Sequence, residues 1–354
     1  MKQLLALLFL ILSGLGSLAQ NIDMGSKSDS DSIEHFKFMP LPYINYDRSL
    51  EFQIGALPMA MYTLNKKDTV SPQSVSGLIG IWTTNKSWFT IAFSKFYLKE
   101  DKWRITAAGG FVSVNFQTYV DLPIGGFINY NTAADFILLQ LQRRVIGKWF
   151  VGFHYDYLKF NTRFAGLDKP KYSYLNGLGV IISRDGRDNV YYPKSGGESE
   201  LDWTNYPSFI NEKGGINKGE LSHNHFFSLR ENKDIIAVRA YAGFGLGDLA
   251  FEQQFIVGQT DIRGYTQGKY RGEQLYSIQG EYRWNFAEKF GLVGFFGLAT
   301  IGGSLNDDYN GLLLPGVGGG FRYTAFEKNH FNVGLDAAVG KDDWGLYFRI
   351  GEAF

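Results

Sequence analysis

The most informative pattern in this 354-residue chain is a repeated alternation of apolar and polar residues. It is clearest in residues 276–286, where aromatic and aliphatic side chains occupy alternate positions and polar or charged side chains fill the positions between them. Successive side chains of a strand point to opposite faces, so each such run predicts a strand with one apolar and one polar face. Similar runs recur at 87–98, 133–145, 148–161 and 311–324.

These runs, separated by turn residues, predict sixteen strands. The expected spans are 41–47, 50–62, 72–84, 87–98, 102–115, 133–145, 148–161, 173–184, 197–204, 219–231, 235–245, 273–286, 290–299, 311–324, 330–340 and 343–354. An even number of strands with an apolar and a polar face is typical of bacterial outer-membrane barrels. A soluble sandwich also alternates, but its aromatic residues would not gather at strand ends. The sequence therefore predicts an all-β, 16-stranded antiparallel transmembrane β-barrel over residues 41–354, surrounded by outer-membrane lipid.

The connections between the predicted strands indicate an orientation. If the first strand starts in the periplasm, short connections such as 99–101, 145–148 and 231–234 face the periplasm. The long connections 116–132, 205–218 and 246–272 then face the outside. Short inner turns and long outer loops are the usual asymmetry of these barrels.

The first forty residues read as export and leader segments. A basic start, the apolar run LLALLFLIL and the small residues Ser17-Leu18-Ala19 predict a signal peptide over residues 1–19. The apolar run is shorter than the ~20 residues that a membrane-spanning helix needs. Residues 20–40 are mostly polar, which predicts a flexible periplasmic leader.

Composition narrows the function further. The chain has 43 Gly, 30 Phe and 21 Tyr, which suits a membrane barrel, and 35 basic against 35 acidic residues, which gives no reason to expect a nucleic-acid partner. The absence of Cys excludes disulfides, thiolate metal sites and a cysteine nucleophile. His223 and His225 share a strand face without an evident third metal ligand, and lumen polarity explains the pair His154 and Asp156. We therefore expect no cofactor, no metal and no enzymatic activity.

A short motif stands in the long predicted loop between the eleventh and twelfth strands. It reads Ile262-Arg263-Gly264-Tyr265. Arginine carries a permanent charge with five N–H donors, and glycine permits backbone conformations that a Cβ would penalise. If the loop folds into the barrel, Arg263 needs a carboxylate partner. We expect Glu281, on the polar face of the twelfth strand, because a strand residue is held more firmly than Asp261 in the same loop.

Three further elements accompany this motif. An acidic stretch ends in a P-x-x-G turn ahead of the ninth strand, an E-x-R sequence occupies the twelfth strand, and the last residue is aromatic. Their residues are Asp188, Pro193 and Gly196, then Glu281 and Arg283, then Phe354. Together with the loop motif, these elements resemble the barrel domain of the BamA/TamA superfamily of outer-membrane insertases and translocases, also called bacterial surface antigens. The resemblance covers residues 41–354.

In that family the last strand is the signal that the assembly machinery reads. The corresponding residues share one parity, broken only by Glu352, and are expected to face lipid: Trp344, Leu346, Phe348, Ile350 and Phe354. Two features depart from the family. Its thirteenth strand often carries an aromatic-x-Asp element, whereas 294–299 holds no acid. Its periplasmic repeats have no counterpart in the leader, which is shorter than the ~30 residues of one such unit.

The resemblance implies a role in protein insertion or transport across the outer membrane, with a periplasmic or outer-membrane protein partner acting in trans. Pro40 and Pro42 flank the start of the first expected strand, which fits a weak seam with the last strand. A passive 16-stranded pore or a structural platform remains an alternative, and a barrel enzyme is a third.

Overall fold

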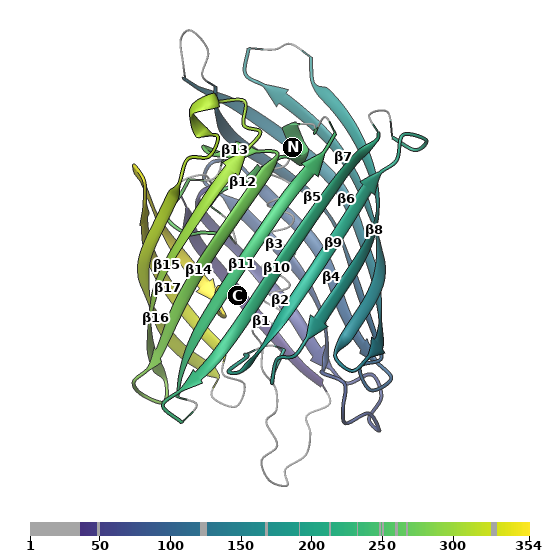
Figure 1. Cartoon of the computed structure of the whole chain (residues 1–354), viewed down its shortest axis with the longest axis vertical. Coiled ribbons are helices and arrows are strands. Elements are labelled where there is room, and N and C mark those ends of the chain that lie inside the picture. The colour runs from purple at the N-terminus through teal and green to yellow at the C-terminus, as the bar shows by residue number, and fades with distance from the viewer. Residues whose placement is uncertain are drawn as a thin grey trace.

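Sixteen strands pair in sequence order to form the wall of a barrel in a computed structural model of the chain (Figure 1). Every pairing between neighbouring strands is antiparallel. The predicted fold class and strand number are confirmed. The structure describes residues 36–354 except 48–49, 121–125, 167–168, 191, 212–213, 232, 248, 250, 259–260, 267 and 327–330. The predicted signal peptide, 1–19, and residues 20–35 of the predicted leader lie outside this part.

The barrel strands match the sixteen predicted runs. Their bounds are β1 Phe36–Asp47, β2 Glu51–Tyr62, β3 Ser74–Thr83, β4 Trp88–Leu98, β5 Trp103–Val120, β6 Gly126–Ile146, β7 Trp149–Phe164, β8 Lys171–Asp185, β9 Gly196–Tyr206, β10 Ile216–Leu229, β11 Asp234–Leu246, β14 Gln274–Asn285, β15 Phe290–Gly302, β16 Leu314–Phe326, β17 Phe331–Gly340 and β18 Asp343–Ile350. Two short 3-10 helices, η1 Phe251–Gln253 and η2 Asp307–Tyr309, lie in connections. No helix within the described ranges is long and apolar enough to cross a membrane.

The two faces of each strand differ in burial as the alternation predicted. On β14, Ile278 is 53% exposed, whereas Glu281 and Arg283 on the opposite face are each 2% exposed. The exposed face of the wall is apolar and forms the lipid-facing belt. The other face lines the lumen, where side chains from different strands and from one loop fill the space.

Some predicted boundaries were wrong. Strand β1 begins at Phe36, so residues 36–40 belong to the wall and not to the leader. The expected loop 116–132 is largely an extended hairpin, because β5 reaches Val120 and β6 starts at Gly126. Both extensions are rich in aromatic, Val, Ile and Thr residues, which favour strands. In Figure 1 the β5–β6 and β7–β8 hairpins both extend beyond the other strand ends at the top of the barrel.

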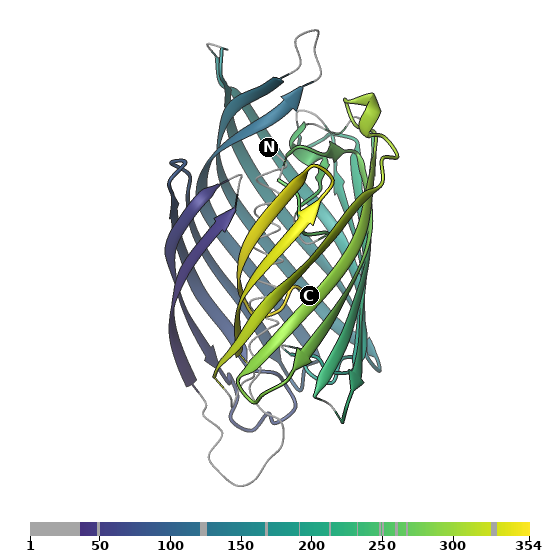
Figure 2. The ribbon, with the colours of Figure 1, turned by 90° about the vertical axis from the view of Figure 1, so that its left-hand side faces the viewer.

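The wall is nearly closed, with a seam between β1 and β18. The hydrogen-bonded order runs from β1 to β18, with no ladder joining those two strands among the described residues. One contact across the seam is a hydrogen bond from the Phe348 N–H to Asn45 Oδ1, at 3.0 Å. Figure 2 shows the first strands, in purple, and the last strands, in yellow, on either side of this seam. Pro40 faces Pro58 in the β1–β2 hairpin, and neither can donate a ladder bond.

Candidate functional site

The connection between β11 and β14, residues 247–273, turns into the lumen, and we call it loop six. Its ends are joined by two short strands, β12 (Phe255–Ile256) and β13 (Arg271–Gly272). Near its middle, Ile262 is 2% exposed, and Arg263 and Tyr265 are each 3% exposed. The motif predicted from the sequence is therefore buried inside the barrel and not displayed on its outer surface.

The Arg263 guanidinium contacts two carboxylates on different strands. Its Nη2 donates to Glu281 Oε2 on β14 at 2.7 Å, and its Nη1 donates to Asp336 Oδ2 on β17 at 2.7 Å. The guanidinium carbon also lies 3.3 Å from the centre of the Phe295 ring, which packs against it from β15. Glu281 is the partner expected from the sequence. A charge held between two carboxylates and an aromatic face is well compensated for its loss of water.

Asp336 is the second partner, and the sequence reasoning missed it. It also accepts from Arg322 Nη1 on β16 at 2.5 Å and from Arg349 Nε on β18 at 2.7 Å. One fully buried carboxylate thus joins loop six to three strands of the wall. The family resemblance points to an acid on the thirteenth strand, β15, which has none, whereas the acid stands on the fifteenth strand, β17. The alternation of β17 could have indicated this partner, because Asp336 lies on the same lumen-facing side of the strand as buried Asn332 and Ala338.

The network continues from Glu281 to the last residues of the chain. Arg283 Nε donates to Glu281 Oε1 at 2.7 Å, and its Nη2 donates to the backbone oxygen of Phe354 at 2.6 Å. Glu352 accepts from Arg322 Nε at 2.9 Å and from Asn332 Nδ2 at 2.8 Å. Loop six, β14, β16, β17 and residues 351–354 therefore share one chain of charge-assisted hydrogen bonds.

Phe354 does not face lipid, contrary to its predicted place at the end of the apolar face of the last strand. The strand ends at Ile350, and Gly351, with φ of 85°, turns the chain into the lumen. The Phe354 ring is 6% exposed in an apolar cluster with Tyr192 and Phe226. The cause is Glu352, whose charge pairs with Arg322 inside the barrel and would be costly in lipid.

The remaining members of the predicted terminal signal behave differently from Phe354. Trp344 and Leu346 are 47% and 38% exposed on the lipid-facing side. Phe348 is half-buried. The side chain of Ile350 lies outside the described part of the structure. The lipid-facing stripe of β18 is thus shorter than expected.

The P-x-x-G turn joins β8 to β9 and folds against the same cluster. Asp188 Oδ1 accepts hydrogen bonds from the backbone N–H groups of Lys194 and Ser195 at 3.0 and 3.2 Å, which closes the turn. Pro193 is buried, and Gly196 takes a φ of 85° at the start of β9. Tyr192, from this turn, packs in the cluster that contains Phe354. The P-x-x-G turn and the C-terminal Phe354 are therefore in one cluster through Tyr192, although Gly196 and Phe354 are 158 positions apart in the sequence.

Gly264 lets loop six approach the wall closely. Its φ is 104°, and an added Cβ would lie 2.7 Å from the backbone carbon of Val339 on β17. Its N–H donates to the Tyr347 hydroxyl at 2.9 Å. The neighbouring Tyr265 hydroxyl donates to the Pro315 backbone oxygen at 2.5 Å and accepts from the Lys341 N–H at 2.9 Å. The motif is therefore held by backbone and side-chain bonds as well as by charge.

The other chemical candidates lie elsewhere. The centres of the His223 and His225 rings lie 5.7 Å apart, with the rings tilted by 37°, and His223 is exposed on the same lipid-facing side as Leu221. The lumen-facing His154 lies 3.3 Å from Asp156 and 3.1 Å from Asp202, as part of a polar wall. Across the described residues, no group of three or more potential ligands is arranged to hold a metal ion.

The contact between Arg263 and Glu281 predicts a measurable coupling. Replacing both residues by alanine should change the free energy of unfolding by a different amount from the sum of the two single changes, with a coupling of ~0.5–3 kcal/mol, because the side chains bond directly. Urea unfolding of the folded barrel in detergent micelles would give the four values. Arg263→Ala combined with Asp135→Ala, at an exposed and distant site, is the control and should be additive. Additivity for the Arg263 and Glu281 pair as well would contradict the contact.

Solved structures of outer-membrane barrels share this architecture. BamA from Haemophilus ducreyi lacking POTRA domains 1–3 matches with a TM-score of 0.60 and 11% identity over 95% of this chain and 76% of that chain. CdiB from Acinetobacter baumannii matches at 0.63 and 13% over 95% of this chain and 66% of that chain. CdiB from Escherichia coli matches at 0.65 and 12% over 93% and 66%. The chain thus spans just under two thirds of each CdiB chain.

At these identities the similarity shows the fold alone. No protein-family model matches the sequence, and no curated protein matches it. The shared fold supports an outer-membrane location for this barrel.

Proposed function

We propose that this barrel acts in the insertion of proteins into the outer membrane or in their transport across it, together with a periplasmic or outer-membrane protein partner. The observation that carries the proposal is the combination of a seam without a ladder and a lumen loop tied to the wall beside it. The resemblance of the loop motif, the P-x-x-G turn and the E-x-R strand to the BamA/TamA superfamily supports the same role.

The seam supplies an edge to which another strand can add. The backbone groups of an unpaired edge template pairing with further chain, and in lipid every such group must find a partner. A seam held by isolated contacts such as Phe348 to Asn45 costs less to open than a ladder. A client strand could therefore pair with the edge of β1 or β18 while the other strands of the wall stay paired.

The lumen network keeps one side of the seam rigid. Asp336 and Glu281 connect loop six to β14 and β17, and through Arg322 and Arg349 to β16 and β18. This brace would let β1 move while β14 to β18 remain one unit. The proposed role is mechanical and requires no catalytic group.

The inner end of the barrel offers a place for a partner. If β1 starts in the periplasm, the connection 63–73 faces the periplasm and exposes Leu64 and Val70, which are 50% and 60% exposed. Asp68 orders this connection, since its carboxylate accepts from the N–H groups of Ser71 and Glu100 at 2.9 and 2.8 Å. An ordered connection that exposes two apolar side chains beside Lys66 and Lys67 offers contacts to a protein partner.

Locking the seam is expected to abolish insertion of a client barrel. The chain has no Cys, so Ile44→Cys with Phe348→Cys can be joined by a short thiol-reactive cross-linker across β1 and β18. In proteoliposomes with the partner present, folding of an added client protein should stop after cross-linking. The matched control joins Ile278→Cys to Leu298→Cys, which already face each other in the β14–β15 ladder. Unchanged client folding with the seam locked would contradict the proposed role.

Electrical recording distinguishes the insertion or transport role from the alternative of a passive pore. The purified barrel alone should show at most weak and unsteady conductance in a planar bilayer, because loop six occupies the lumen. Large, steady conductance, together with no client folding, would favour the pore.

A further inference from the structure

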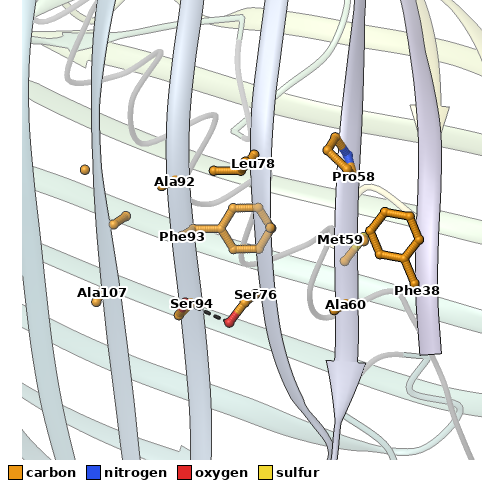
Figure 3. Close-up of a pocket in the computed structure, with 13 residues that line it drawn as sticks. Phe38, Pro58, Met59, Ala60, Ser76, Leu78, Ala92, Phe93, Ser94 and Ala107 are labelled. Atoms are coloured by element: carbon orange, nitrogen blue, oxygen red, sulfur yellow. Dashed lines mark hydrogen bonds between the residues drawn. The ribbon is translucent and has the colours of Figure 1, made fainter. Parts of the chain in front are cut away.

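A groove of about 550 Å³ crosses the first five strands of the wall (Figure 3). Small residues make up much of its lining, among them Ala60, Ala92, Ala107 and Gly109. Phe38 and Leu78 border it and are 58% and 57% exposed. Because these residues belong to the outward face of their strands, the groove lies in the lipid-facing belt.

The sequence explains why the wall is hollowed here. The β2–β3 ladder is interrupted between the pairs Ala56↔Gly80 and Met59↔Gly77, without a change of register, and Pro58 lies in the interruption. Proline has no N–H to donate to a ladder. The two strands are therefore less closely joined at this point, and the small side chains of β4 and β5 leave the space beside them unfilled.

The polar groups in the groove are already paired. The hydroxyls of Ser76 and Ser94 are hydrogen-bonded at 2.8 Å, and the Tyr62 hydroxyl is bonded to Ser76 at 2.8 Å. The dashed line in Figure 3 marks the bond between the two serines. Because these hydroxyl groups already have partners, they do not require a polar ligand. The rest of the lining is apolar and therefore favours an apolar ligand.

We propose that this groove is a binding site for an acyl chain of an inner-leaflet phospholipid. A hollow in the hydrocarbon region cannot be filled by water, and an empty one forfeits the dispersion contacts of its lining. A flexible hydrocarbon chain fills such a space, and the groove falls within the ~300–1,000 Å³ of ordinary ligand clefts. The occupant is thus a lipid chain and not a soluble molecule.

The position of the groove selects the inner leaflet. Pro58 and Ala60 stand close to the end of β2, which leads into the connection 63–73, and the orientation proposed above places that connection in the periplasm. This connection carries Lys66 and Lys67, both exposed. Their ammonium groups can attract the phosphate of a lipid whose chain lies in the groove.

Photochemical labelling tests the proposal. The full chain is reconstituted in phosphatidylethanolamine vesicles that contain a trace of phosphatidylethanolamine with a diazirine on one acyl chain, and the labelled residues are mapped by mass spectrometry. We expect labelling of residues in β1 to β5 around the groove to exceed labelling of the remaining lipid-facing residues severalfold. Even labelling around the belt would overturn the proposal.

Filling the groove provides the matched variant. Ala92→Leu with Ala107→Leu stays apolar, so it should fold normally by heat-modifiable gel mobility yet reduce labelling to the level of the belt. Ala240→Leu is the control, because Ala240 is exposed on the outward face of β11, away from the groove, and should leave the labelling unchanged. Labelling that survives in the filled variant would contradict the site. Excess labelling with diazirine-bearing lipid A alone would contradict the inner leaflet.

Discussion

Replacement of Asp336 by alanine is expected to lower the free energy of unfolding of the barrel by about 3–5 kcal/mol, the cost of breaking a buried ion pair. The carboxylate is fully buried and accepts from Arg263, Arg322 and Arg349. Its loss leaves three neighbouring guanidinium groups with one carboxylate fewer, and their charges then repel one another. Urea unfolding of the folded barrel in detergent micelles would measure the change.

A comparison with Arg263 makes this prediction more specific. Arg263→Ala should cost less than Asp336→Ala, because Glu281 keeps Arg283 and Asp336 keeps Arg322 as partners. The control is Asp135→Ala, which removes an exposed pair with Lys159 at 3.3 Å and should cost at most ~1 kcal/mol. If Asp336→Ala destabilised the barrel no more than Asp135→Ala, the lumen network would not stabilise the fold.

Replacement of Gly264 by alanine is expected to release loop six from the wall. The φ of 104° disfavours any residue with a Cβ, and the added carbon would lie 2.7 Å from the backbone of Val339. Because backbone atoms of a paired strand cannot give way, the loop has to move, and Arg263 would lose its carboxylates. Trypsin added to proteoliposomes should then cleave loop six after Arg263, which is buried in the unaltered barrel.

Gly311→Ala distinguishes the cost of the positive φ from the effect of the close approach to Val339. Gly311 has a similar positive φ, 75°, but an added Cβ would meet no atom within 4 Å. This control carries the conformational cost of ~1 kcal/mol without the close approach. Cleavage of loop six that was equal in the two variants would show that the contact with β17 does not hold the loop.

The wall could be predicted from the sequence because lipid and water impose opposite demands on alternate residues. That alternation places Ile278 outside and Glu281 inside from the local pattern alone. The partner of Arg263 on the neighbouring strand followed from the same parity. The extra length of β5 and β6 also has a signal in the sequence, since residues 116–120 and 126–132 carry strand-forming side chains.

The rest of the site depends on contacts between distant segments. Asp336 meets Arg263 because loop six descends to β17, and no local pattern encodes how far a loop enters a lumen. Parity also placed Phe354 in lipid, although Gly351 ends the alternation three residues earlier. The short β12–β13 pairing inside loop six was missed for a similar reason, since strands of two residues have no period to detect.

The prolines of the β1–β2 hairpin also determine where neighbouring strands of the wall separate most easily. Pro40, Pro42 and Pro58 supply no ladder donor to β1 and β2, whereas β5 and β6 pair without a break from Trp103 to Val120. Fluctuations that separate neighbouring strands therefore begin at the hairpin next to the seam and reach β5 and β6 last. The β1–β2 hairpin is thus the most deformable part of an otherwise rigid wall.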